Sequence, residues 1–167
     1  IYESEIPDIS NKCITVMCAD NGIVKEGISQ SDKDVTLAVA KSMALGTSSI
    51  AVLSKAAGSK MTVFDMGIDS FEIYSLGVIN HKLMHGTNNF IKEKAMPLDI
   101  TLRALLTGIS TVRELKDNKT KIIGTGEMGI GNTTTSSALS AAILNLPVED
   151  VTGRGAGLDD IKLNKKI

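Results

Sequence analysis

The chain has 167 residues, of which 43% are hydrophobic and 3% aromatic, and its formal net charge is −1. This length is enough for one globular domain with a sizeable core, and we expect a single α/β domain over residues 1–167. Near-neutral charge and few aromatic rings argue against a nucleic-acid surface, and no uninterrupted apolar run is long enough to span a bilayer.

The two cysteines, Cys13 and Cys18, fall in one predicted strand. At a separation of five residues they point to opposite faces, so a disulfide between them is not expected. Buried free thiols fit a reducing compartment, and no signal-peptide pattern opens the chain. We therefore expect a cytoplasmic protein.

Residues 13–19 read C-I-T-V-M-C-A, a nearly continuous apolar run that predicts a strand buried on both faces of a parallel sheet. The strand ends at Asp20, Asn21 and Gly22, which form a turn signal. In open α/β sheets, ligands gather at the carboxyl ends of strands. Asp20 is therefore either a site residue or a turn former, and its chemistry by itself favours the turn.

Two helices are predicted next. Val35, Val39 and Met43 share one face of the first helix, which Gly46 ends. The second helix ends at Gly58. Its apolar stripe consists of Ile50, Leu53, Ala56 and Ala57.

A second strand is predicted over residues 61–66, M-T-V-F-D-M, with a carboxylate near its end. Further on, His81 and His85 have a spacing that could bind a metal on a helix. Their glycine-rich flanks predict an extended or loop segment instead, and the chain has no other histidine. We expect no metal.

The clearest amphipathic pattern follows Pro97. Apolar side chains repeat at helical spacing, and we interpret them as the face of a helix that covers the core. These residues are Leu98, Leu102, Leu105, Ile109 and Val112.

Residues 121–135, K-I-I-G-T-G-E-M-G-I-G-N-T-T-T, predict a strand, a tight glycine loop and the start of a helix. Glycine permits positive φ and close approach of a ligand to the backbone. Asn and Thr suit a helix cap, and the exposed N–H groups there attract an anion, most naturally a phosphate. A glycine-rich turn without a ligand is the alternative.

The same stretch formally fits a dinucleotide fingerprint through Gly124, Gly126 and Gly129. The predicted helix begins later than that fingerprint requires, after Asn132, and Glu127 sits inside the predicted loop. An NAD-dependent oxidoreductase therefore stays an alternative to a mononucleotide site.

A fourth helix is predicted between the glycine loop and Pro147, and a second glycine cluster follows it at 152–157. The apolar face of that helix consists of Ala138, Leu139, Ala142, Ile143 and Leu146. Arg154, among glycines, suits a phosphate or carboxylate through its fork of parallel donors. Alternatively, residues 153–157 are a flexible linker and Asp159 caps a helix over 162–166. The order of strands and helices predicts a layered α/β fold.

Together these motifs resemble the nicotinate-nucleotide–dimethylbenzimidazole phosphoribosyltransferase family. Two stretches are the most specific, G-E-M-G-I-G-N-T-T at 126–134 and T-G-R-G-A-G-L-D-D at 152–160. Further matches run along the chain in the family's order: A-D-N-G at 19–22, E-G-I-S at 26–29, G-T-S-S-I at 46–50, V-F-D-M-G-I at 63–68 and G-T-N-N at 86–89.

The resemblance implies a three-layer α/β/α fold with a mainly parallel, Rossmann-like sheet, a smaller helical part and a homodimer. It implies phosphoribosyl transfer from nicotinate mononucleotide to 5,6-dimethylbenzimidazole in cobalamin lower-ligand synthesis. The products are α-ribazole 5′-phosphate and nicotinate, with inversion at the anomeric carbon. No cofactor is expected.

The resemblance also implies roles for individual residues. Those expected to cradle the nucleotide phosphate are Gly129, Gly131, Asn132, Thr133 and Thr134. Those expected to line the nucleotide from the second loop are Gly153, Arg154, Gly155 and Gly157. Lys166 matches a family lysine near the phosphate, and Ser29 falls in the benzimidazole pocket. Glu127 has an auxiliary polar role, and Asp20 completes the substrate-binding set.

Family members are about twice as long, and their usual general base, a glutamate near the C-terminus, has no counterpart in this chain. An N-terminal helical segment is also missing, and the first residue is not Met. We therefore expect a fragment with little or no transferase activity. A non-catalytic nucleotide-binding module is a further alternative.

Overall fold

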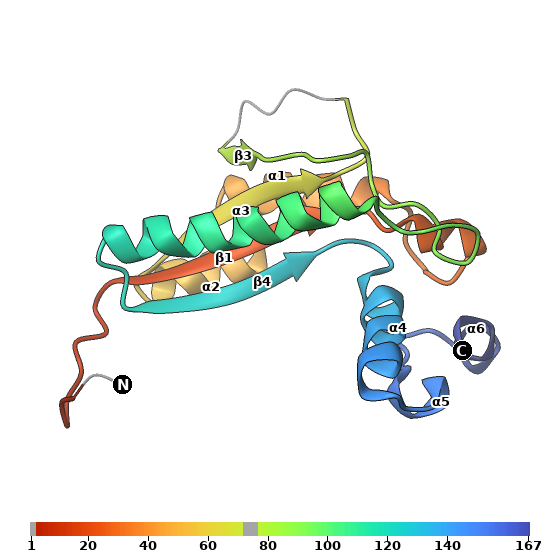
Figure 1. Ribbon diagram of the computed structural model, residues 1–167. Helices are drawn as coiled ribbons and strands as arrows, with labels where there is room; N and C mark the ends of the chain where they lie inside the picture. Colours follow the sequence, from red (N-terminus) through yellow and green to blue (C-terminus); the bar gives the residue numbers. More distant parts are fainter. Residues whose placement is uncertain (1–2, 72–76) are drawn as a thin grey trace.

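The computed structural model describes residues 3–71 and 77–167, and these contain one parallel sheet (Figure 1). The spatial order of its strands is β3-β2-β1-β4, and every neighbouring pair runs parallel. The strands are β1 (Lys12–Ala19), β2 (Ser59–Gly67), β3 (Val78–Asn80) and β4 (Ile122–Met128).

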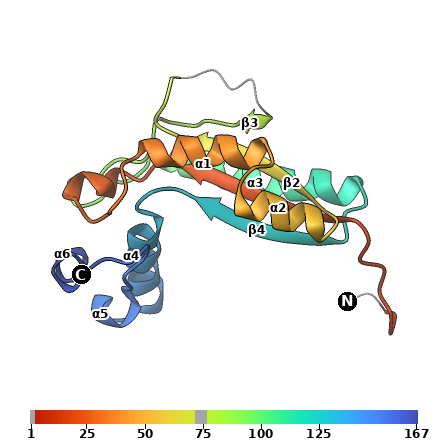
Figure 2. The same ribbon diagram turned by 180° about the vertical axis from the view of Figure 1, so that it is seen from behind.

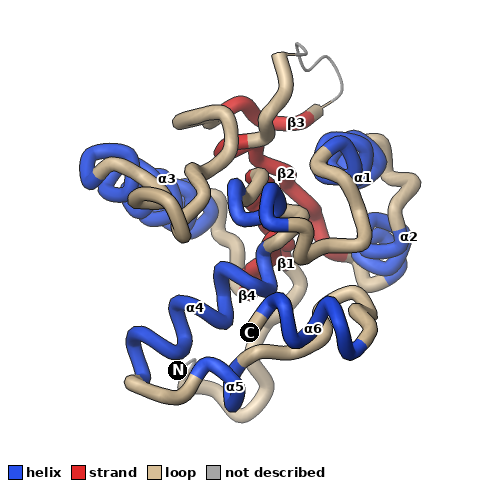
Figure 3. The backbone as a smooth tube through the Cα atoms, turned by 90° about the vertical axis from the view of Figure 1, so that its right-hand side faces the viewer, coloured by secondary structure: helices blue, strands red, loops and turns tan. Residues whose placement is uncertain are grey.

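Helices cover both faces of this sheet, with α1 and α2 on one side and α3 on the other (Figure 3). The predicted three-layer α/β/α fold is therefore confirmed. The helical elements are the 3₁₀ helix η1 (Gly22–Glu26), α1 (Asp34–Ala44), α2 (Ser49–Ala56), α3 (Leu98–Asp117), α4 (Asn132–Leu144), α5 (Val148–Val151) and α6 (Asp160–Lys166). Helices α4 to α6 form a separate group beyond the carboxyl end of β4 (Figures 1 and 2).

The core lies between the sheet and α1. Val16 and Cys18 of β1, Val63 of β2, and Ala40 and Met43 of α1 are buried together. Strand β1 pairs with β2 along one edge and with β4 along the other, so its apolar run lies in the interior of the parallel sheet, as its sequence predicts. Both cysteines are buried and free, which confirms the expectation of no disulfide.

The apolar faces predicted for the first two helices are partly wrong. In α1 the buried residues include Thr36, whereas Val35 is exposed. In α2 the buried residues are Ala51 and Ser54, and the predicted stripe residue Leu53 is exposed. The small side chains let α2 approach the sheet closely, and the Ser54 hydroxyl donates to the Ser59 carbonyl at 2.9 Å.

Helix α3 forms where it is predicted, but its apolar stripe does not cover the core. Leu102 is 51% exposed and Leu105 61% exposed, and Thr111 is the buried residue of this helix. A cavity of about 580 Å³ separates α3 from the sheet, and polar side chains such as Thr15 and Thr62 line it. Since the facing sheet surface is rich in threonine, it offers the stripe little apolar surface to bury.

Within residues 34–56 an 18-residue stretch has a mean hydropathy of 1.4, which is long and apolar enough to cross a membrane by composition. In the structure they form two helices, α1 and α2, interrupted at Gly46, and both contact β2. Two helices packed on a sheet account for this apolar stretch.

Candidate functional site

Strand β4 runs further than its sequence predicts. Gly124 and Gly126 pair in register with Ile14 and Val16 of β1, so they are strand residues. Glu127 is also in the strand, and its expected place inside the loop is wrong. The dinucleotide fingerprint needs its first glycines in the turn, so the chain does not form that motif.

The tight loop consists of Gly129, Ile130 and Gly131. A Cβ atom on Gly129 would lie 2.0 Å from the Ala19 carbonyl oxygen, so only glycine fits against the end of β1. Gly131 has φ of 87° and is the residue that precedes α4. The loop therefore depends on glycine for two reasons, close packing at one end and a left-handed backbone at the other.

Helix α4 begins without a side-chain cap, contrary to the prediction that Asn or Thr caps it. The Asn132 side-chain amide donates instead to the Glu127 carboxylate. The Asn132 and Thr134 backbone amides donate to the Gly129 and Gly131 carbonyls, at 3.1 and 3.0 Å. The positive end of the helix dipole therefore meets the loop without an acidic side chain at its cap.

Lys166, at the end of α6, reaches back to this helix start. Its Nζ atom donates to Thr133 Oγ1 and to the Gly153 carbonyl, each at 2.9 Å. Lys166 is only 9% exposed, and burial lowers the pKa of its ammonium group. The contact joins the two glycine clusters at one cation.

Arg154 holds its own loop. It donates to the Leu158 carbonyl at 2.9 Å and pairs with the Asp160 carboxylate. Asp159 accepts a hydrogen bond from the Lys162 amide at 2.7 Å, which confirms it as the cap of the last helix.

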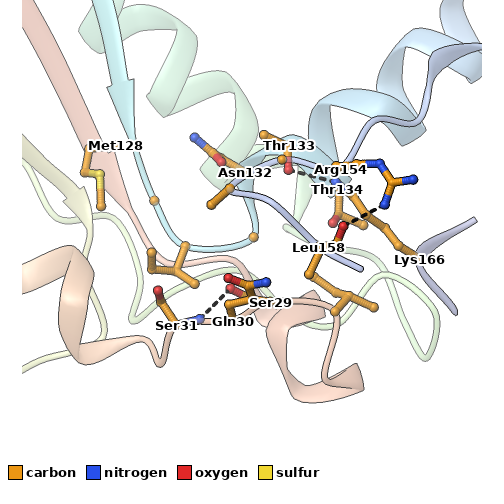
Figure 4. A pocket seen from close by; sticks show the side chains of 16 residues that line it. Ser29, Gln30, Ser31, Met128, Asn132, Thr133, Thr134, Arg154, Leu158 and Lys166 are labelled. Carbon is orange, nitrogen blue, oxygen red and sulfur yellow. Dashed lines mark hydrogen bonds between the residues drawn. The ribbon is translucent and has the colours of Figure 1, made fainter. Parts of the chain in front are cut away.

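These elements enclose a cavity of about 180 Å³ (Figure 4). The nine predicted site residues that line it are Ser29, Gly129, Gly131, Asn132, Thr133, Thr134, Arg154, Gly155 and Lys166. The lining residues to which no role was assigned are Ile28, Gln30, Ser31, Met128, Ile130, Ala156 and Leu158. Five of them lie inside the motif stretches, and Gln30 and Ser31 directly follow the stretch 26–29, so their place in the sequence was the available signal.

Four predicted site residues lie outside the lining, and three of them, Gly153, Gly157 and Glu127, form hydrogen bonds with residues that line it. The Gly153 carbonyl accepts from Lys166, and the Gly157 carbonyl accepts from the Gln30 side chain at 2.8 Å. Glu127 touches the site through Asn132. Although Glu127 is exposed, desolvation by the surrounding protein raises the pKa of its carboxyl group, while the hydrogen bond from Asn132 opposes that rise.

Asp20 also lies outside this cavity. It lines a neighbouring one of about 360 Å³, together with Asp69 and His85. Its carboxylate is 6% exposed, and Oδ2 accepts a hydrogen bond from the Asp69 amide at 2.8 Å. Burial raises the pKa of the Asp20 carboxyl group, and the residue lines this neighbouring cavity rather than the one beside Lys166.

The Thr134 hydroxyl belongs to a residue that lines the first cavity, the one of about 180 Å³. Thr134 is 7% exposed, and its Oγ1 atom has no hydrogen-bond partner among the described residues. A buried polar atom without a partner costs free energy, so it marks a place where a ligand atom could be accepted.

His81 and His85 lie in a loop, and residues 3–71 and 77–167 hold no group of three His, Cys, Asp or Glu side chains suited to a metal.

The fold and the cavity define an α/β protein with a candidate anion site at the carboxyl end of β4. A family profile described as phosphoribosyltransferase matches residues 1–167. The nicotinate-nucleotide–dimethylbenzimidazole phosphoribosyltransferase of Clostridium acetobutylicum is 44% identical over 161 residues, and that of Acetivibrio thermocellus is 43% identical. The chain therefore belongs to the nicotinate-nucleotide–dimethylbenzimidazole phosphoribosyltransferase family, whose named relatives are enzymes.

Solved structures agree with this assignment. CobT from Thermus thermophilus has a TM-score of 0.91 and 34% identity, over 96% of this chain and 48% of that one. A second structure of the phosphoribosyltransferase from that organism has a TM-score of 0.87 and 32% identity. The chain spans about half the length of the curated relatives it matches, 46% of the Clostridium acetobutylicum protein.

Proposed function

We propose that this chain binds nicotinate mononucleotide and carries the nucleotide-loop half of a phosphoribosyltransferase that transfers phosphoribose to 5,6-dimethylbenzimidazole. The products are α-ribazole 5′-phosphate and nicotinate. The observation that carries this proposal is the convergence of three kinds of donor on one cavity. They are the Lys166 ammonium, the unpartnered Thr134 hydroxyl and the start of α4.

The donors suit a phosphate dianion. Lys166 uses two N–H groups on Thr133 and Gly153, which leaves its third N–H for a ligand oxygen. The Thr134 hydroxyl has a proton to give, and the helix dipole favours negative charge at the same place. Such charge-assisted hydrogen bonds are about twice as strong as neutral ones.

Other lining residues suit the nicotinate and benzimidazole rings. Ile28, Met128 and Leu158 give the cavity apolar surface, and Ser29 and Gln30 supply polar atoms. A ring held there lies next to the sugar of a nucleotide whose phosphate sits at α4. Alignment of two reactants by one cavity lowers the entropic part of the barrier.

In the proposed reaction, the bond between the anomeric carbon and the nicotinate nitrogen breaks as a benzimidazole nitrogen bonds to that carbon from the opposite side. The pyridinium takes the electron pair and leaves as nicotinate, and the benzimidazole N–H proton passes to a base. We propose an auxiliary role for Glu127 next to the sugar, because its carboxylate accepts a hydrogen bond from Asn132, which lines the cavity. Among the described residues no carboxylate or imidazole lines the cavity to take the benzimidazole proton, so we propose little or no turnover by these 167 residues alone.

Titration calorimetry tests the proposal. We expect the chain to bind nicotinate mononucleotide, and to bind NAD and the phosphate-free riboside at least tenfold more weakly. Equal affinity for nucleotide and riboside would contradict a phosphate-centred site. A nicotinate-release assay, with the full-length Clostridium acetobutylicum relative as positive control, should show no release above background by this chain.

A second candidate is a non-catalytic nucleotide-binding module, since the cavity offers anion donors and, among the described residues, no carboxylate lines it. The release assay separates it from an active enzyme, because only the enzyme frees nicotinate. We further propose a cytoplasmic homodimer, for which the exposed leucines of α3 provide apolar surface. Sedimentation equilibrium should give twice the chain mass, and a monomer at all concentrations would contradict it.

A further inference from the structure

Thr36 is a buried polar residue on an otherwise apolar helix face. It has 0% exposure in α1, and its Oγ1 atom accepts a hydrogen bond from the Ile130 backbone amide at 3.1 Å. Ile130 is the middle residue of the glycine loop, and it lies 94 positions away in the chain. The hydroxyl of a helix that packs on the sheet therefore holds the loop that lines the nucleotide cavity.

The threonines within helix α3 do something different. Thr101, Thr107 and Thr111 of α3 each donate to the carbonyl four residues earlier, at 2.9 to 3.1 Å. That local bond is the usual one for threonine within a helix. In the described residues Thr36 has a long-range partner instead, so its hydroxyl is committed to tertiary structure.

Asp20 lies beside Thr36, and the Thr36 side chain lowers the pKa of the Asp20 carboxyl group against the rise that burial causes. The Oδ1 atom of this carboxylate is buried and has no hydrogen-bond partner among the described residues. A hydroxyl that gave its proton to this atom would leave its lone pairs for another donor, such as the Ile130 amide.

Asp20 is itself held by the surrounding loops. Its amide donates to the Gly67 carbonyl, and its carbonyl accepts from the Thr87 amide, both at 3.0 Å. Its Oδ2 atom accepts from the Asp69 amide at 2.8 Å. These three hydrogen bonds therefore hold Asp20 at the ends of β1 and β2 without any contribution from Thr36.

We propose that Thr36 is a positioning residue that fixes the Gly129–Gly131 loop through the Ile130 amide, with Asp20 orienting the Thr36 hydroxyl. The loop sets where α4 begins, and so where Thr133, Thr134 and the helix dipole meet the phosphate. The consequence for affinity rests on the proposed nucleotide site, whereas the consequence for loop order does not.

Two measurements on the 167-residue chain separate these consequences. Amide hydrogen exchange at Ile130 and Gly131, without ligand, reports the order of the loop. Calorimetric titration with nicotinate mononucleotide reports the site. The variants are Thr36→Val, which keeps the shape and removes the hydroxyl, Thr36→Ser, which keeps the hydroxyl, and Asp20→Asn. Thr111→Val removes a buried threonine hydroxyl on α3 and serves as the matched control.

Thr36→Val should speed exchange at Ile130 and weaken nucleotide binding, each about tenfold, the size expected for one hydrogen bond. Thr36→Ser should restore both, Asp20→Asn should speed exchange by a smaller factor, and Thr111→Val should change neither. Wild-type exchange at Ile130 in Thr36→Val, or equal effects of Thr36→Val and Thr111→Val, would overturn the proposal.

If Thr36→Val does not fold, Asp20→Asn decides: wild-type exchange at Ile130 in that variant overturns the orientation by Asp20. If the wild type binds no nucleotide, the proposed function fails, and exchange still tests the positioning.

Discussion

The Nζ atom of Lys166 lies 2.9 Å from Thr133 Oγ1, a residue 33 positions earlier in the chain. This single contact brings the last helix onto the start of α4 and joins the two glycine clusters into one cavity. A cation buried beside a helix start costs stability in the empty protein and gains a partner when an anion arrives.

We predict that Lys166→Met weakens binding of nicotinate mononucleotide about 30-fold, which corresponds to ~2 kcal/mol for a charge-assisted hydrogen bond. The same change should leave the unfolding temperature equal or higher, because burial lowers the pKa of Lys166 and penalises its charged form. Calorimetry and thermal unfolding check the two parts. Lys162→Met, on the same helix but outside the cavity lining, should leave affinity unchanged.

We predict that Thr134→Val stabilises the ligand-free protein by about 1 kcal/mol, since it removes a buried hydroxyl without a partner. It should also weaken nucleotide binding, because in the proposed site the hydroxyl that it removes donates to the phosphate of the nucleotide. Urea unfolding with and without the nucleotide measures both effects. A variant that is less stable than the wild type would show that the hydroxyl has a partner within the fold.

Gly129→Ala and Gly153→Ala form a matched pair. A Cβ on Gly129 would lie 2.0 Å from the Ala19 carbonyl oxygen, and a Cβ on Gly153 would meet no atom within 4 Å. We predict a loss of about 2 to 3 kcal/mol in unfolding free energy for Gly129→Ala, because the loop must move away from β1. Gly153→Ala should stay within about 0.5 kcal/mol of the wild type. Similar losses in both would contradict this account.

The pH dependence of stability should reveal Glu127. Desolvation by the surrounding protein raises the pKa of its carboxyl group above the ordinary value of 4.5, so the folded state binds the proton more tightly than the unfolded state. Stability should therefore fall as pH rises from 4.5 through the raised pKa of the folded state. Asp20 has a pKa raised in the same direction, so the measurement is the difference between wild type and Glu127→Gln in urea unfolding. A difference that does not change with pH in that window would contradict the prediction.

Local patterns predicted most of the elements. The apolar run of β1, the glycine ends of α1 and α2, and the helix after Pro97 all occur where they are predicted. Periodicity did not predict which helix face is buried. It reports that a face is apolar, whereas burial depends on which surface the sheet presents, and β1 and β2 present Thr15 and Thr62 to α3.

For the candidate site, too, some features could be predicted from local sequence patterns and others depended on tertiary packing. From residue types alone, the sequence predicted that two glycine clusters suit an anion, and the family resemblance added Lys166 and a phosphate role for Thr133 and Thr134. Only the tertiary structure decided that β4 absorbs Gly124, Gly126 and Glu127, and that Asp20 lies outside the cavity. Strand pairing and loop packing join residues that are distant in the chain, and neither leaves a mark within a short stretch of sequence.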